Sequence, residues 1–189
     1  MQTLKGFIDF ILHLDTHLLS IVNQYGTLTY LILFTIIFCE TGLVIIPFLP
    51  GDSLLFVAGA IAAQGSLNLW LLFGIMTFGA VLGDGVNYTI GKWIGPRVFE
   101  NNRFKLINKE YLHRAQDFYD RKGAIVIVLA RFIPIVRTFA PFVAGISKMN
   151  YRKFFIYNLV GGVLWVTTML LAGFFFGNIP VVKENFSLV

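Results

Sequence analysis

The sequence carries little charge and almost no cysteine. Only 13% of its 189 residues are Asp, Glu, Lys or Arg, whereas a soluble domain has about 25%. This shortage argues against a water-soluble globular protein. The 57% of hydrophobic residues, with 20 phenylalanines, indicates an integral membrane protein formed as one domain over residues 1–189. The single cysteine, Cys39, excludes an internal disulfide.

Several functional motifs are also missing. No P-loop occurs, so ATP does not drive the protein by itself, and no nucleic-acid-binding motif accompanies the net charge of +5. No histidine lies in an expected membrane segment, which argues against a membrane phosphatase. His13 and His17 have a spacing that can hold a metal, but no strong third ligand is nearby. We therefore expect no enzyme, no metal, no cofactor and no nucleic-acid partner.

The hydropathy pattern predicts helices throughout. Residues 4–24 and 96–122 have apolar residues at helical spacing among polar ones, which is typical of helices that lie at the membrane surface. Residues 69–91 and 154–177 are long and apolar enough to cross a bilayer. The sequence therefore predicts two interfacial helices and two full membrane spans.

Two further apolar stretches contain helix breakers. Residues 27–46 could cross a bilayer, but they run into a break and a short apolar run, 53–63, that cannot span. Residues 124–146 lie between two basic segments, so a crossing would put one of these outside, against the positive-inside tendency. We therefore expect two re-entrant hairpins. The predicted hairpin breaks are Pro47, Pro50 and Gly51 in the first stretch, and Pro134 and Pro141 in the second.

The same order of elements occurs twice. Phe56-Val57-Ala58-Gly59 follows the first break, and Phe142-Val143-Ala144-Gly145 follows the second. Each half, 1–95 and 96–189, would contain an interfacial helix, a re-entrant hairpin and one full span. One span per half places the hairpins on opposite membrane faces, as in transporters with inverted repeats. The predicted fold is therefore an all-α integral membrane protein with an inverted repeat.

Four charged residues lie inside the two broken stretches: Glu40, Asp52, Arg131 and Arg137. A charge at membrane depth costs about 2.5–3.5 kcal/mol, so it is rare unless it is paired or functional. Two guanidiniums at a broken helix can clamp a phosphate, but they could also only bond freed carbonyls or neutralise the acids. The acids could carry protons or form static ion pairs, and Asp52 could also cap the helix that starts there.

Polar residues also follow one face of the predicted span 69–91. Asp84, Asn87 and Tyr88 occur at i, i+3 and i+4. They could line a pathway together with Thr138, or they could only mark a polar helix end near the cytoplasmic surface. Small residues such as Gly161-Gly162 could pack a homodimer or the helices of one chain.

Several of these segments resemble the DedA family of bacterial inner-membrane proteins. The resemblance covers almost the whole chain, and it implies two opposed re-entrant hairpins in a multi-pass protein of the bacterial inner membrane. The family's essential acids correspond to Glu40 and Asp52, and its essential arginines correspond to Arg131 and Arg137. The matching segments are 38–42, 47–55, 130–138 with Ala144-Gly145, Gly83-Asp84 and 165–177.

The resemblance and the four charges together predict a membrane lipid translocase. Arg131 and Arg137 would hold the phosphate head group of undecaprenyl phosphate or a phospholipid. Glu40 and Asp52 would take up protons, so that the proton-motive force could drive transport. These acids would alternate with the phosphate as partners of the arginines. One alternative is a proton-coupled exporter or channel for a small ion or drug. Another is a non-transporting factor in envelope homeostasis.

Overall fold

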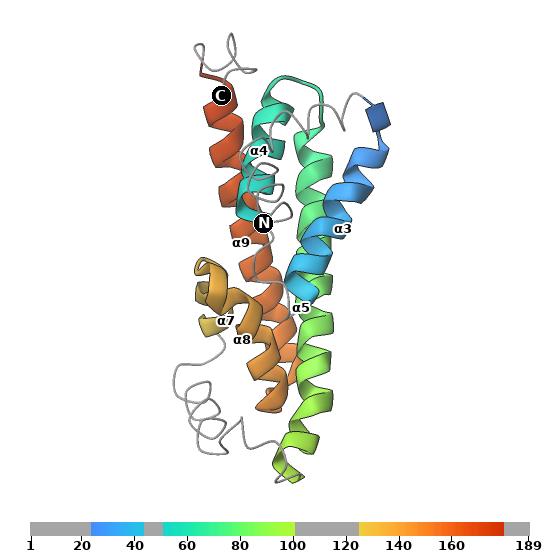
Figure 1. The fold of residues 1–189 in the computed structure, drawn as a ribbon. Helices are drawn as coiled ribbons and strands as arrows, with labels where there is room; N and C mark the ends of the chain where they lie inside the picture. Colours follow the sequence, from blue (N-terminus) through green and yellow to red (C-terminus); the bar gives the residue numbers. More distant parts are fainter. Residues whose placement is uncertain (1–23, 44–50, 101–124, 180–189) are drawn as a thin grey trace, which may run out of the picture. The chain divides into compact units, whose positions relative to one another are not determined.

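The computed structural model describes residues 24–43, 51–100 and 125–179. Every regular element within these ranges is an α-helix (Figure 1), so the all-α prediction is confirmed for this part of the chain. The expected surface helix 4–24, most of 96–122 and the break residues Pro47 and Pro50 lie outside the described residues. The helices are α3 (Leu28–Gly42), α4 (Gly51–Ala63), α5 (Leu69–Glu100), α7 (Ile125–Ala130), α8 (Pro134–Ile146) and α9 (Tyr151–Gly177).

Two of the described helices are long and apolar enough to cross a membrane. They are Leu69–Ile94 of α5, with 26 residues, and α9, with 27 residues. At about 1.5 Å per residue, each exceeds the hydrocarbon thickness of about 30 Å. The helices predicted over 69–91 and 154–177 are therefore present, and the Gly83-Asp84-Gly85 stretch does not interrupt α5.

The two broken stretches contain shorter helices. Helix α3 has 15 residues, about 22 Å, which is shorter than the predicted segment 27–46 and too short to cross a bilayer. In the second stretch α7 ends at Ala130 and α8 begins at Pro134. Proline suits the first helical position, because its ring fixes φ and the missing N–H has no partner there anyway. The break at Pro134 therefore agrees with the prediction.

Pro141 does not interrupt a helix. It lies inside α8, which continues to Ile146, so the prediction of a break at this position is wrong. Proline removes one helical hydrogen bond and crowds the carbonyl four residues earlier. Helices in apolar surroundings nevertheless continue through proline when neighbouring groups satisfy the freed backbone. Gly51 is the first residue of α4, at the end of the first predicted break.

The described residues fall into two compact units. Unit 1 comprises 24–36, 51–76 and 166–179, and unit 2 comprises 37–43, 77–100 and 125–165. Each unit therefore contains segments from both predicted halves of the chain. The division into repeats 1–95 and 96–189 stays a prediction.

In unit 1, helices α4 and α9 pack so closely that their backbones are in contact. A Cβ atom on Gly59 would collide with the carbonyl of Leu170, and one on Gly173 would collide with the carbonyl of Phe56. The missing side chains let the two helix backbones approach each other. Any larger residue at either glycine would force α4 and α9 apart.

In unit 2, helix α8 lies against α5 in the same way. A Cβ atom on Gly145 would collide with the carbonyl of Tyr88, and one on Gly91 would collide with the carbonyl of Phe142. In both units each helix contributes a glycine and a backbone carbonyl three residues earlier. The two crossings therefore have the same construction, although their sequences share only Phe-Val-Ala-Gly on the shorter helix.

Candidate functional site: a buried charge cluster

The first ion pair of unit 2 joins α3 to α8. Arg137 lies in the first turn of α8, where the break at Pro134 places it, and Glu40 lies near the end of α3. Nη2 of Arg137 donates a hydrogen bond to Oε1 of Glu40, and only 8% and 1% of the two side chains are exposed. A buried charge is stable only when it is paired and hydrogen-bonded. The structure therefore contains one of the predicted ion pairs between an acid and an arginine.

The second ion pair joins the α7–α8 turn to α5 and α9. Nη2 of Arg131 donates to Oδ2 of Asp84 and to Oδ1 of Asn158. The amide nitrogen of Asn158 donates to the carbonyl of Val81, at 3.1 Å. Asp84 was predicted as a pathway residue and not as a partner of an arginine. Asn158 was missed, although an amide within an apolar span is itself a signal of function or of specific packing.

An aromatic ring lies beside both arginines. The ring centroid of Trp165 is 5.9 Å from Cζ of Arg131 and 5.0 Å from Cζ of Arg137. Tryptophan is the side chain that best stabilises a cation over its face. Trp165 therefore offsets part of the repulsion between two neighbouring guanidiniums. The structure brings both arginines to one ring.

Two glycines of α9 make room for Arg131. A Cβ on Gly161 would lie 3.1 Å from Cδ of Arg131, and one on Gly162 would lie 3.6 Å from its Cζ. The sequence left open whether these glycines pack a homodimer or the helices of one chain. In this structure they pack against Arg131 of the same chain, and the homodimer stays a prediction.

The four acidic and basic side chains of the cluster balance each other. Arg131 and Arg137 carry two positive charges, and Glu40 and Asp84 carry two negative charges when ionised. Asp52, the second acid predicted from the sequence, belongs to unit 1 and lies in the first turn of α4. A carboxylate there interacts favourably with the helix dipole, and its proton-coupling role stays a prediction.

The remaining predicted pathway residues make hydrogen bonds that tie helices together. The amide nitrogen of Asn87 donates to the carbonyls of Thr41 and Thr138, at 3.1 and 2.8 Å. The hydroxyl of Tyr88 donates to the carbonyl of Met149. Both residues thus hold α5 to its neighbours in unit 2. Whether they also line a pathway stays a prediction.

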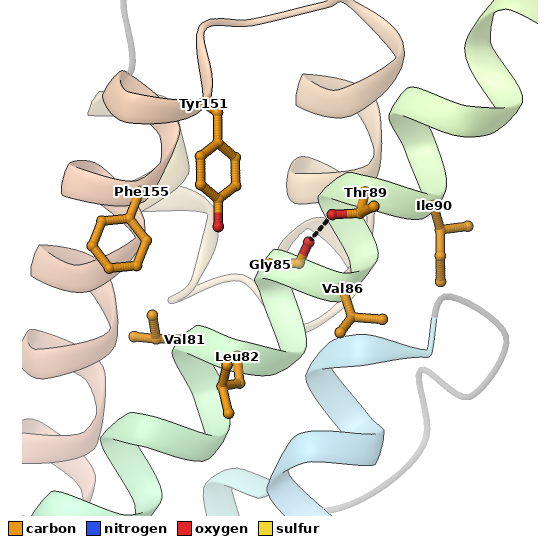
Figure 2. Close-up of a pocket in the computed structure, with 8 residues that line it drawn as sticks. All are labelled: Val81, Leu82, Gly85, Val86, Thr89, Ile90, Tyr151 and Phe155. Atoms are coloured by element: carbon orange, nitrogen blue, oxygen red, sulfur yellow. Dashed lines mark hydrogen bonds between the residues drawn. The ribbon is translucent and has the colours of Figure 1, made fainter.

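An apolar groove lies beside the cluster on α5 and α9. Figure 2 shows the Tyr151 hydroxyl directed toward α5, where Oγ1 of Thr89 donates to the Gly85 carbonyl at 2.7 Å. The groove has a volume of about 300 Å³. Val81 belongs to the groove, and its carbonyl accepts the hydrogen bond from Asn158, so the groove adjoins the charge cluster. Its lining residues are Val81, Leu82, Gly85, Val86, Thr89, Ile90, Tyr151 and Phe155.

Known proteins identify the family of this chain. The sequence model of the VTT domain matches residues 49–180. Protein DedA of Escherichia coli (strain K12) is 51% identical over 191 residues, which cover 100% of this chain and 87% of that protein. The chain belongs to the DedA family of VTT-domain proteins.

Two further relatives have lower identity to this chain. An uncharacterized membrane protein of Mycobacterium tuberculosis (strain H37Rv) is 42% identical over 156 residues, covering 82% of this chain and 68% of the relative. Inner membrane protein YghB of Escherichia coli (strain K12) is 36% identical over 177 residues, covering 94% and 78%. No solved structure matches the chain. Taken with the two long apolar helices, these relatives identify this DedA-family chain as a membrane protein.

Proposed function

We propose that this protein carries lipids with a phosphate head group across the membrane, without an enzymatic step. The observation that supports the proposal is the buried cluster in which Arg131 and Arg137 each bind one carboxylate beside the shared ring of Trp165. Guanidinium groups bind phosphate with the same paired donors that bind carboxylate. The phosphate of undecaprenyl phosphate or of a phospholipid would therefore replace a carboxylate at the arginines.

Replacement of a carboxylate explains how protons would enter the cycle. When a phosphate binds Arg137 in place of Glu40, the buried carboxylate of Glu40 loses this positively charged partner. An isolated buried carboxylate is costly, so it takes up a proton. The proton leaves again when the lipid departs and the ion pair forms once more. Asp52 is proposed, from the resemblance to the family, as a second acid of this kind.

The groove next to the cluster suits the tail of such a lipid. It is lined mainly by apolar side chains, and Val81 connects it to Asn158 in the cluster. A substrate with a charged head and an apolar tail could place one part in each. A small hydrophilic ion would use only the cluster. This difference favours the lipid over the small ion or drug considered from the sequence.

The transport proposal includes an inverted repeat in a multi-pass protein of the bacterial inner membrane. The support is the equal construction of the two helix crossings, Gly59 with Gly173 and Gly145 with Gly91. Each crossing joins the second helix of one broken stretch to the long helix of the other half. In transporters with inverted repeats the binding site lies where the two repeats meet, and both repeats would contribute helices to such a site here.

Translocation in proteoliposomes tests the proposed function. Purified wild type, Arg137→Ala and Glu40→Ala would be assayed with undecaprenyl phosphate and a phosphatidylethanolamine probe, with and without a pH gradient. Arg152→Ala is the matched control, because Arg152 is an exposed arginine at the start of α9. We expect both cluster variants to lose transport and the control to retain it. Transport retained by a folded Arg137→Ala protein would refute the role of the cluster, and transport of neither lipid would favour a small solute.

A further inference from the structure

Four residues on one face of α9 contact the guanidinium arm of Arg131. Asn158, Gly161, Gly162 and Trp165 occur at i, i+3, i+4 and i+7, a spacing that places them on one side of a helix. Asn158 accepts a hydrogen bond from Nη2, the two glycines leave space for the arm, and Trp165 lies beside the guanidinium. We call these four residues the arginine seat.

The hydrogen bonds of Arg131 are distributed unevenly. Nη2 has two N–H bonds, and Asp84 and Asn158 accept both. Nε of Arg131 is buried and has no hydrogen-bond partner among the residues that the structure describes. A buried N–H without a partner is unfavourable, so it indicates a place where a ligand oxygen can bind. Asp84 and Asn158 therefore hold Nη2, whereas Nε, which lies 3.3 Å from the position of a Cβ on Gly161, has a hydrogen that no described residue accepts.

We propose that the arginine seat is a positioning site, which keeps Arg131 oriented throughout the cycle so that its Nε–H meets the substrate phosphate. Asn158 is its central positioning residue, because a neutral amide can hold the guanidinium without competing with the phosphate as a carboxylate would. This inference rests on the proposed function. It gives the two arginines different roles. Arg131 stays bound to Asn158 of α9, while the ion pair of Arg137 with Glu40 opens and closes.

The fluorescence of Trp165 can be used to measure ligand binding at the arginine seat. Trp70 and Trp93 are 81% and 72% exposed, whereas Trp165 is 1% exposed. In a Trp70→Phe/Trp93→Phe background, tryptophan fluorescence therefore reports only on the arginine seat. The probe is dihexanoyl phosphatidic acid, a soluble lipid with a phosphomonoester head group, titrated into the full chain in detergent. We expect a saturable change in emission, which Arg131→Ala abolishes.

The decisive variant is Asn158→Leu in this background. We expect its half-saturating probe concentration to rise about tenfold, because a hydrogen bond to a charged group is lost. Asn158→Gln keeps an amide acceptor and should restore most of the affinity, which a role in packing alone would not predict. Asn178→Leu is the matched control, since Asn178 is an exposed asparagine at the end of the same helix.

A glycine variant tests the seat if Asn158→Leu does not fold. In Gly161→Ala the new methyl group presses on Cδ and Nε of Arg131, whereas Gly74→Ala has no atom within 4 Å of its Cβ. We expect weaker probe binding in the first variant only. If the seat variants bind like wild type while Arg131→Ala does not bind, the seat is refuted and the proposed function stands. If wild type and Arg131→Ala both fail to bind the probe, the phosphate site itself is refuted, and the seat with it.

Discussion

Glu40 and Arg137 are 97 positions apart in the sequence and form an ion pair that is almost completely buried. The pair joins the end of α3 to the first turn of α8, just after the interruption between α7 and α8. A buried ion pair seldom adds stability over an apolar pair of similar size, because both ions lose their hydration. If the pair serves transport, as proposed above, stability and transport should respond differently to its removal.

Removing one partner should destabilise the protein more than removing both. Glu40→Leu leaves Arg137 buried without its carboxylate, and we expect a loss of about 3–5 kcal/mol in the free energy of unfolding. Glu40→Leu/Arg137→Leu should recover most of that loss but remain inactive in transport. Denaturant unfolding in detergent, run beside the proteoliposome assay, measures both quantities. A double variant as unstable as the single one would contradict the argument.

The structure also assigns a carboxylate to each arginine, which a double-mutant cycle can check. Residues in one ion pair show coupling energies of about 0.5–3 kcal/mol, whereas independent residues are nearly additive. We expect Asp84→Asn and Arg131→Gln to be strongly coupled. The crossed combination, Glu40→Gln with Arg131→Gln, is the control and should show weaker coupling. Equal coupling in both cycles would mean that Arg131 interacts with Glu40 as strongly as with Asp84.

Sequence reasoning found the arginines but not all of their partners. Charge at membrane depth and the proline between them singled out Arg131 and Arg137, because both signals are local. The pairing of Arg131 with Asp84 depends on the packing of α5 against the α7–α8 turn, which no spacing along the chain encodes. Trp165 was noted only within a matching segment, since an aromatic residue in an apolar span has no pattern that distinguishes it.

The helices show the same division between local and distant effects. The long apolar segments of α5 and α9 were predicted to within a few residues at most ends, because length and hydropathy determine them. The end of α5 at Glu100 differs from the predicted end at 91, since a helix can continue through polar residues. Pro141 was misjudged because its effect on a helix depends on neighbours that the sequence does not reveal.

Asn87 should be essential for folding through its two hydrogen bonds. Its amide nitrogen donates to the buried carbonyls of Thr41 and Thr138. In Asn87→Asp, a carboxylate oxygen would face these carbonyls without a donor, and each buried group left unpaired costs about 1–3 kcal/mol. Thermal unfolding in detergent measures the loss. Asn150→Asp, at an exposed asparagine whose Oδ1 only accepts from backbone N–H groups, should have little effect, and a stable Asn87→Asp protein would argue against this bridging role.

The glycine crossings should tolerate no side chain. In Gly145→Ala the new methyl group would collide with the carbonyl of Tyr88, so α5 and α8 would have to separate. We expect a loss of about 1–3 kcal/mol in the free energy of unfolding from overpacking. Gly74→Ala should instead stabilise α5 slightly, because alanine favours helix and the Cβ meets no atom within 4 Å. Equal effects of the two substitutions would show that the α5–α8 contact is not close in solution.

Filling the groove beside the cluster should separate lipid transport from folding. A Cβ on Gly85 would meet only the Tyr151 hydroxyl, at 3.9 Å, so a side chain can be accommodated there and would occupy the groove. We expect Gly85→Leu to keep the thermal stability of wild type but to lower the transport of long-chain lipids severalfold. Gly74→Leu adds the same side chain elsewhere on α5 and serves as the control. Binding of the short-chain phosphatidic acid should change little in Gly85→Leu, since that probe depends mainly on the arginines. Unchanged long-chain transport would mean that the lipid tail does not enter the groove.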